Sequence, residues 1–375
     1  MFLATRLLCI SLLLFLVPRL WAQENQGVEI DFLASYYDQD GDHSPVTGGR
    51  GSEELQSISP VFLVKYTTKS GWNLNGSLGA DNITSASTDN IDLDANGVNL
   101  SSASRVDNRV FANLAASRAF GSQTWGGSVG FSKEYDYRSI SAGLNWAWNF
   151  NGKNNTLAAA VTRYQDEVEL YNIDGNVDGT EDRETTDLSL SLTHVFSPRT
   201  VGMIEWSISD QSGWLSSPFQ EVILQSGEHV QEHLPDARTR NALRLSLNHA
   251  FSEGLVLRSY ARYYDDDWDI TATSLEIEPH FRLGGDAKRW LYPILRWHSQ
   301  DGSNYFGLPE TFTAADAYYT ADRDLSTFDS MKFGLGYEVQ RAQGRIKRYQ
   351  VRATYYDRDD GLTSFNLSFG LGFTL

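Results

Sequence analysis

Two histidines and a glutamate lie at a spacing that zinc peptidases use. His229, Glu232 and His233 form the pattern H-x-x-E-H. On a helix, this pattern brings both imidazoles to one face for the metal and leaves the carboxylate free to act in catalysis. The segment lies in an expected outer loop, with no supporting helix and no convincing third ligand. An ordinary polar loop is therefore favoured over adventitious metal binding and over catalysis.

Acidic residues alternate near the start of the chain. Asp38, Asp40 and Asp42 surround Gly41, like the first part of a calcium-binding loop, because Ca²⁺ takes several oxygen ligands at once. The later ligands of such a loop are missing from the sequence. Two interpretations stay open. One is a weak calcium site at a strand end, which could also bridge the protein to lipopolysaccharide through divalent ions. The other is a solvated acidic turn.

Charged residues also recur at every second position of several stretches. Residues 275–283 have apolar side chains at odd positions, whereas Glu276, Glu278, His280 and Arg282 occupy the even ones. This alternation predicts a strand with one apolar and one polar face. If the apolar face meets lipid, the charged face must line an interior, because a charge facing lipid costs about 2–4 kcal/mol at the bilayer midplane. The residues expected to line that interior are Arg244, Arg258, Arg262, Arg282, Arg296, Arg348, Arg352, Glu276, Glu278, Glu338, His280 and His298.

Two interpretations of this charged interior stay open. In one, the charges select solutes in a pore, as rings of charge do in channels. In the other, they pair with one another and brace the wall. The chain is not expected to form a nucleophile elbow, which needs a sharp strand-to-helix turn. We therefore predict no catalytic residue and no cofactor, and an enzyme acting at the barrel rim stays a less favoured alternative.

Residues 1–22 have the features of a cleaved secretory signal. Arg6 supplies a positive start, residues 7–17 are apolar without interruption, and Pro18 precedes an exit that ends at Ala22. The apolar run is shorter than the roughly 20 residues of a membrane-spanning helix. We expect a mature chain of residues 23–375, with a short membrane anchor as the alternative. The only cysteine, Cys9, lies within this signal, so the mature chain should hold no disulfide or thiol-bound cofactor.

Composition narrows the class of protein further. The formal net charge is −17, which argues against nucleic acid as a partner, because binding phosphates needs a basic surface. Aromatic residues make up 13% of the chain, whereas disordered acidic chains have few of them. The sequence therefore predicts a folded, exported protein.

Period-two alternation predicts the fold. Residues 365–375 carry Phe or Leu at every odd position and small or polar residues between them, and similar patterns cover 140–150, 243–248 and 333–339. Short turns such as 69–71 and 151–154 alternate with longer acidic connections at 38–54, 85–107, 171–183, 214–237 and 299–325. This asymmetry is typical of a bacterial outer-membrane barrel. We predict one all-β domain, a transmembrane antiparallel up-and-down β-barrel of about 16 strands, over a soluble β-sandwich or propeller.

Five local motifs lie in series along the chain: DNITSAS at 81–87, SKEYDY at 132–137, RYYDDDWDI at 262–270, RWHSQ at 296–300 and YTADRDLS at 319–326. In order and spacing they resemble a family of Gram-negative outer-membrane β-barrels catalogued as a domain of unknown function. The resemblance runs from about residue 29 to the end. It implies the same fold and location but no activity. Members tend to be encoded beside a flavin-transfer protein, a thioredoxin-like protein and a small lipoprotein, which implies a cell-surface redox assembly.

Together these features predict an outer-membrane barrel, in contact with lipid and lipopolysaccharide, that works as a porin-like channel for small polar or anionic solutes. The arginines among the interior residues are the reason for the anionic preference. The alternative, which depends on the resemblance alone, is a scaffold barrel that holds a periplasmic redox protein at the outer membrane.

Overall fold

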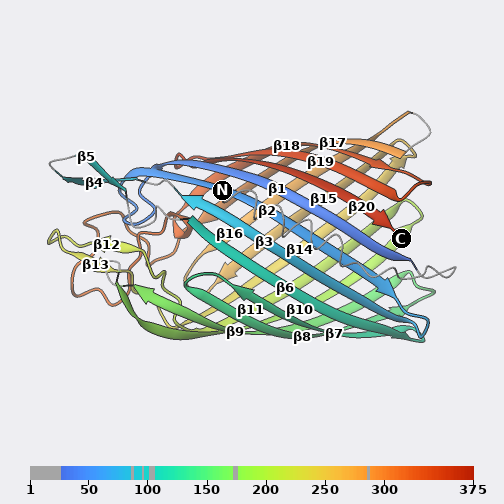
Figure 1. Cartoon of the computed structure of the whole chain (residues 1–375), viewed down its shortest axis with the longest axis horizontal. Helices are drawn as coiled ribbons and strands as arrows, with labels where there is room; N and C mark the ends of the chain where they lie inside the picture. Colours follow the sequence, from blue (N-terminus) through green and yellow to red (C-terminus); the bar gives the residue numbers. More distant parts are fainter. Residues whose placement is uncertain (1–26, 86–87, 95–96, 101–105, 172–175, 285–287) are drawn as a thin grey trace, which may run out of the picture.

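The structure, a computed structural model, describes residues 27–85, 88–94, 97–100, 106–171, 176–284 and 288–375. The predicted signal peptide, residues 1–22, lies outside these ranges. The described chain forms a closed antiparallel barrel of 16 strands, which are inclined to the long axis (Figure 1). The predicted architecture and strand number are therefore confirmed. Among the residues that the structure describes, no helix is long and apolar enough to cross a membrane.

Each barrel strand pairs with the barrel strands before and after it in the chain. Two small hairpins are not part of the barrel wall. The wall consists of β1 (Val28–His43), β2 (Arg50–Thr67), β3 (Trp72–Ser85), β6 (Val106–Phe120), β7 (Gln123–Lys133), β8 (Tyr137–Phe150), β9 (Asn155–Tyr171), β10 (Val177–Ser197), β11 (Thr200–Gly213), β14 (Ala237–Ser252), β15 (Leu255–Asp266), β16 (Thr271–Leu283), β17 (Lys288–Asp301), β18 (Phe328–Gln340), β19 (Ile346–Arg358) and β20 (Thr363–Thr374). The outlying hairpins are β4 (Thr88–Asp94) with β5 (Gly97–Leu100) and β12 (Glu221–Ile223) with β13 (His229–Gln231).

The barrel closes where the first strand meets the last. β1 pairs with β2 on one side and with β20 on the other, so that Phe32 lies between Phe62 and Leu371. The rings of Phe32 and Phe62 are 4.9 Å apart. These three side chains belong to the outward face, because side chains at paired positions of antiparallel strands share one face. The alternation in 365–375 thus supplies half of an apolar seam.

The inward face packs tightly on the wall of β16 to β19. Tyr292 is 2% exposed, stacks on His280 at 4.3 Å between ring centres, and accepts a hydrogen bond from Gln350. Its ring lies over Gly336, where an added Cβ would come within 2.1 Å of a ring carbon. An aromatic side chain covering a glycine across a strand pair protects the backbone that the glycine leaves bare.

At the end of the barrel that carries the long connections, the strands extend beyond their predicted boundaries. The prediction of a loop over 38–54 is wrong for most of its length, because β1 continues to His43 and β2 starts at Arg50. Asp40 pairs with Glu54 in this extension. The expected loop over 171–183 is likewise partly strand, since β10 starts at Val177. Polar composition was taken to indicate loop, but a ladder outside the hydrocarbon layer tolerates polar side chains on both faces.

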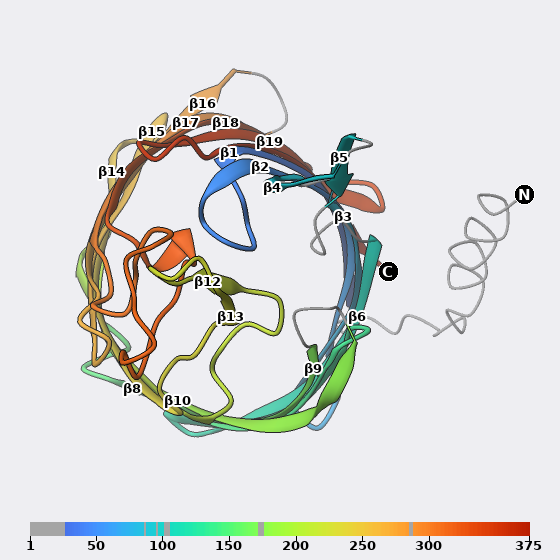
Figure 2. The ribbon, with the colours of Figure 1, turned by 90° about the vertical axis from the view of Figure 1, so that its left-hand side faces the viewer.

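Three of the long connections fold together across this end of the barrel, where Figure 2 shows them inside the ring of strands. We call residues 44–49, 214–236 and 302–327 the cap. Its apolar centre is formed by Val222, Leu224 and Ala321. The backbone of His233 exchanges two hydrogen bonds with that of Tyr319, of 2.8 and 3.1 Å. The cap is therefore a small folded unit with its own core.

The first connection is tied to the other two. The amide of Glu221 donates to the carbonyl of Val46 at 2.8 Å. Arg323, in the short helix η1 (Arg323–Leu325), donates twice to the carbonyl of Gly48, at 2.7 and 3.0 Å. Gly48 has a φ of 63° and lies so close to Ala321 that a side chain would not fit. All three connections therefore hold one another in place.

A buried carboxylate links the second and third connections. Glu232 is 2% exposed and accepts hydrogen bonds from the amide of Ser217 at 2.5 Å and from the hydroxyl of Thr320. Burial outweighs these two hydrogen bonds and raises the pKa of Glu232 to about 7. Burial, with the nearby charge of Asp324, also raises the pKa of Asp322 to about 6. The cap thus contains two acids that hold their protons more tightly than in an unfolded chain.

We predict that the cap loosens as the pH rises. A carboxyl group with a raised pKa favours the folded form most below its ordinary pKa, and this contribution is lost as the pH rises from about 4.5 to the folded value of about 7. Amide hydrogen exchange of 214–236 and 302–327, corrected for the intrinsic rate, should be about ten-fold faster or more at pH 8 than at pH 6. Glu232 dominates the change over this interval, because its pKa of about 7 lies within it, whereas the pKa of Asp322 is about 6.

The variant Glu232→Gln should exchange like the unaltered protein at pH 6 and should show little further opening at pH 8. Glu228→Gln is the matched control, because Glu228 is exposed in the same connection. An unchanged pH effect in Glu232→Gln would contradict the assignment to this carboxylate.

Replacing Gly336 by Ala should destabilise the barrel by roughly 1–3 kcal/mol, because the new methyl group overlaps the ring of Tyr292. The measurement is the urea concentration at which the folded band disappears in unheated gel electrophoresis. Gly127→Ala is the control, since its nearest contact would be an ordinary 3.4 Å. Equal midpoints for the two variants would show that the ring moves aside without cost.

Candidate functional site

A set of arginines lies on the lumen face of two adjacent strands. Leu243 and Leu245 of β14 are 41% and 52% exposed on the outward face, so Arg244 between them faces the lumen. Arg244 pairs in register with Arg262 of β15, and Arg258 pairs with Asn248. Arg240 lies four residues before Arg244 on the same face. We call Arg240, Arg244, Arg258 and Arg262 the arginine track.

The track runs along the barrel rather than around it. β14 leads from the cap end, where Arg240 pairs with Asp266, to the end with short turns, and β15 returns. Four residues of strand span about 13 Å, so Arg240, the Arg244–Arg262 pair and Arg258 occupy three successive levels. An anion moving through the lumen would meet a guanidinium group at each level.

The guanidinium groups of the track form no close ion pair, although Glu205 faces Arg244 and Glu278 faces Arg258 on the neighbouring strands. Within the described ranges, none of the four lies within 4.0 Å of a carboxylate oxygen. Arg244 instead contacts the ring of Tyr260 at 4.4 Å and donates to Ser246 at 3.1 Å. Arg262 lies 5.5 Å from the ring of Tyr264. Aromatic and hydroxyl groups, rather than direct ion pairs, are therefore the close contacts of Arg244 and Arg262.

Elsewhere the lumen charges are paired. Arg352 donates to Glu278 at 2.9 Å, and His280 lies 3.3 Å from the other oxygen of that carboxylate. Lys332 lies 2.8 Å from Glu276. Further pairs join Arg348 to Asp31 at 3.0 Å and Arg238 to Asp266 at 2.5 Å. Ion pairs thus brace the wall from β16 round to β1 and the cap end of β14 and β15, whereas the four arginines of the track form none among the described residues.

The strand registers place all twelve predicted interior residues on the lumen face. Some lie apart from the pairs above. His298 hydrogen bonds Ser274 at 2.8 Å, Arg296 contacts the ring of Tyr356, and Glu338 accepts from Gln340 at 2.7 Å. Arg282 is exposed near the end with short turns. Their position on the lumen face does not test whether they select solutes, so that role stays a prediction.

Sequence reasoning missed several lumen residues at the cap end. Arg238 and Arg240 lie in β14 between the predicted loop 214–237 and the predicted strand pattern 243–248, and Lys332 and Asp187 were not singled out. The signal was present, because Arg238, Arg240 and Ala242 continue the alternation of 243–248. It was overlooked because the outward residues opposite them, such as Thr239 and Asn241, are polar.

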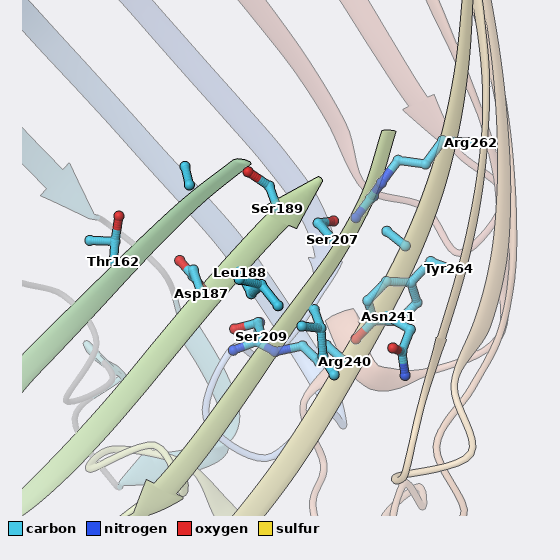
Figure 3. A pocket seen from close by; sticks show the side chains of 13 residues that line it. Thr162, Asp187, Leu188, Ser189, Ser207, Ser209, Arg240, Asn241, Arg262 and Tyr264 are labelled. Carbon is cyan, nitrogen blue, oxygen red and sulfur yellow. The ribbon is translucent and has the colours of Figure 1, made fainter. Parts of the chain in front are cut away.

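The track borders two cavities on the lumen wall. One, of about 300 Å³, lies across β9 to β15 and includes Arg240, Arg262 and Tyr264 (Figure 3). The other, of about 400 Å³, includes Arg244 and Arg258. Both volumes lie at the small end of the range for ligand pockets.

The H-x-x-E-H residues do not form a metal site. His229 lies in strand β13, which ends at Gln231, and Glu232 is buried against Ser217 and Thr320 instead of beside the two histidines. His229 hydrogen bonds Glu221 at 3.1 Å, and His233 hydrogen bonds the carbonyl of Ala317 at 2.8 Å. The motif needs a helix, and here the segment forms a hairpin of the cap.

Other candidate sites are placed as follows. Asp38 accepts hydrogen bonds from Tyr36 at 3.2 Å and from Gln56 at 3.4 Å, while Asp40 and Asp42 are exposed. In the part of the chain that the structure describes, no group of three or more His, Cys, Asp or Glu residues is arranged to hold a metal ion. A G-x-S-x-G sequence does occur, at residues 126–130, but it lies inside β7 and not on a turn.

Comparisons with solved structures show the same kind of fold. A bacterial polysaccharide outer membrane secretin is 11% identical, with a TM-score of 0.51 over 93% of this chain and 98% of that one. OpdK of Pseudomonas aeruginosa, crystallised with vanillate, is 8% identical, with a TM-score of 0.44 over 94% and 99%. A BenF-like porin from Pseudomonas fluorescens Pf-5 is 9% identical, with a TM-score of 0.47 over 94% and 99%.

No curated protein matches the sequence. The family described as Protein of unknown function (DUF3570) matches residues 19–367, which confirms the resemblance carried by the five motifs. Because this match covers nearly the whole length, the chain belongs to the DUF3570 family.

Proposed function

We propose that the protein is an outer-membrane channel for small anionic solutes. The observation that supports the proposal is the arginine track, whose four guanidinium groups occupy three successive levels of the lumen and, among the described residues, lie more than 4.0 Å from every carboxylate oxygen. Fixed positive charges on the wall of a narrow aqueous path raise the local concentration of anions and repel cations.

The contrast between the two parts of the wall argues for this role over simple bracing. Where charges brace, as in Arg352 with Glu278 or Lys332 with Glu276, the partners lie within 3 Å. Unpaired arginines add nothing to such a network and repel one another, so their placement costs stability. A function that uses the free charges, such as attracting anions, accounts for that cost.

Location in the outer membrane is part of the proposal. The outward face is a band of exposed apolar residues, such as Leu245, Leu335 and Leu367, which are 52%, 52% and 42% exposed. A soluble barrel would leave such a band in water at a large hydrophobic cost. The likeness to an outer membrane secretin supports the same location. The predicted signal peptide would supply the export, and lipid and lipopolysaccharide would surround the wall.

The cap narrows the outer mouth over part of its width (Figure 2). A solute would pass the cap before reaching Arg240, so the channel is expected to admit small solutes. The scaffold alternative stays a prediction from the family resemblance, and no residue that the structure describes favours a redox partner.

Single-channel recording of the refolded protein under a KCl gradient tests the proposal. We expect stable conductance steps and a reversal potential that indicates anion preference. The double variant Arg258→Glu and Arg262→Glu should lower the anion-to-cation permeability ratio several-fold and bring it to one or below, because it replaces two positive charges of the track by negative ones.

The control is Arg199→Glu with Arg345→Glu, which makes the same change of charge on exposed turn residues outside the wall. It should leave the permeability ratio nearly unchanged. A protein that inserts correctly but never conducts, or a ratio that the lumen double variant leaves unaltered, would refute the proposed function.

A further inference from the structure

The cavity of about 300 Å³ between Arg240 and Arg262 arises from the strand registers. One row across the wall contains Ser189, Ser207 and Ala242, whose small side chains form the floor of the cavity. The adjacent row toward the cap contains Thr162, Asp187, Ser209 and Arg240. The cavity is therefore a depression in the wall with a basic end and a hydroxyl-rich, acidic end.

The basic end holds donors that the protein itself does not use. The Nε of Arg240 is buried and has no hydrogen-bond partner among the described residues, although another nitrogen of that group donates to Gln211. Arg262 extends from β15 toward Ser207 in Figure 3, and its guanidinium group forms no hydrogen bond or ion pair with any residue that the structure describes. A buried donor without an acceptor is uncommon in folded proteins and calls for an explanation. Two guanidinium groups aimed at one depression suit a carboxylate, which can accept from both.

The other end carries groups that recognise hydroxyls. The side-chain hydroxyls of Thr162, Ser189, Ser207 and Ser209 form no hydrogen bond with any other residue that the structure describes. Asp187 lies on the same row as Ser209 and forms no ion pair there. Its carboxylate can only accept hydrogen bonds when ionised, so it suits the hydroxyl groups of a ligand.

We infer that this cavity is a binding site for hydroxylated carboxylic acids of about the size of one sugar ring, such as a hexuronic acid. The inference rests on the proposed function and gives it a substrate class. The Cα atoms of Asp187 and Arg240 are two strand spacings, about 10 Å, apart. A single ring that carries both a carboxylate and hydroxyl groups can therefore meet both ends of the cavity. Tyr264 offers an aromatic face beside it.

Simpler ligands fit less well. A chloride ion or an apolar carboxylate would use the arginines but would leave Asp187 as a nearby like charge. A neutral sugar would use Asp187 and the serines but would leave the donor of Arg240 unpaired. A site built to hydrogen bond a group rejects the analogue that lacks it, because its own polar atoms then lose their partners. The pairing of Asp187 with the arginines therefore selects for ligands that carry both kinds of group.

The neighbouring cavity of about 400 Å³ repeats part of this composition one level further from the cap. It combines Arg244 and Arg258 with Tyr260 and Ser246, but its acids Glu276 and Glu278 are already paired with Lys332 and Arg352. The same ligand is expected to bind there more weakly, which suits a second step along a path.

Calorimetric titration of the detergent-solubilised protein tests the inference without requiring conduction. The three probes are D-glucuronate, cyclohexanecarboxylate, which has the ring and the carboxylate but no hydroxyls, and D-glucose, which lacks the carboxylate. We expect glucuronate to bind at least ten-fold more tightly than either of the others.

Two variants separate the ends of the site. Arg262→Gln should weaken glucuronate and cyclohexanecarboxylate alike, about ten-fold. Asp187→Ala should weaken glucuronate and strengthen cyclohexanecarboxylate, because it removes the acceptor and the like charge together, so that the preference between them disappears. Asp178→Ala, an exposed acid of the same strand, and Arg199→Gln are the matched controls and should change neither affinity. Unheated gel mobility confirms that each variant is folded.

Equal binding of glucuronate and cyclohexanecarboxylate, or a preference that survives Asp187→Ala, would overturn the inference. If anion-selective conduction is present but this preference is absent, the inference fails and the proposed function stands. If the preference is present in a barrel that never conducts, the site stands and the channel function fails.

Discussion

A strand that crosses hydrocarbon must pair every backbone amide and carbonyl on both of its edges. This barrel meets that requirement only because β1 pairs with β20 as well as with β2. Once the sheet is closed, each strand has one face toward the outside and one toward the lumen. The period-two pattern, the outward apolar band and the inward position of the charges all follow from this closure. A slip of β1 by one residue against β2 and β20 would turn Phe32 inward and Asp31 outward.

Closure confines the charges but does not decide how they pair. From β16 round to β1, carboxylates pair with basic residues that lie two or three strands away, as Glu278 of β16 pairs with Arg352 of β19. On β14 and β15, arginine faces arginine in the Arg244–Arg262 pair. On β10 and β11, the lumen face has a cluster of hydroxyl residues, Ser189, Ser191 and Thr193 on β10 with Ser207 and Ser209 on β11. The lumen therefore has a neutralised side, a positive side and a hydroxyl-rich side, and the cavity of Arg240 and Asp187 lies where the last two meet.

The architecture could be predicted from the sequence because alternation acts locally. The alternation in residues 365–375 and 275–283 predicts which face each side chain occupies, and it does so without information from distant parts of the chain. The same rule placed Arg258, Arg262 and Arg352 on the lumen face. The rule could not be applied where the outward residues become polar. Arg240 was therefore missed, although it lies on the lumen face of β14 like Arg244.

What could not be predicted depends on contacts between distant segments. Whether an arginine is paired depends on residues far away in the chain, as Arg348 with Asp31 shows. The cap could not be foreseen, because its core joins Val222 to Ala321 across two separate connections. The role of Glu232 could not be predicted for the same reason: its H-x-x-E-H spacing is local, whereas the carboxylate hydrogen bonds Thr320 of a distant connection.

The cap has a consequence for the order of assembly. Its bond between Arg323 and Gly48 joins residues 275 positions apart. Contacts between such distant segments form late, because the intervening chain must first be ordered. Here that ordering is the closure of the sheet, since only the β1–β20 seam brings the two ends of the chain to adjacent places on the rim. We therefore expect that the cap is absent from an unclosed barrel, and that its three connections pack together only after the sheet has closed. Protease resistance of residues 302–327 would then report that insertion has gone to completion, which makes the cap a built-in marker of maturation.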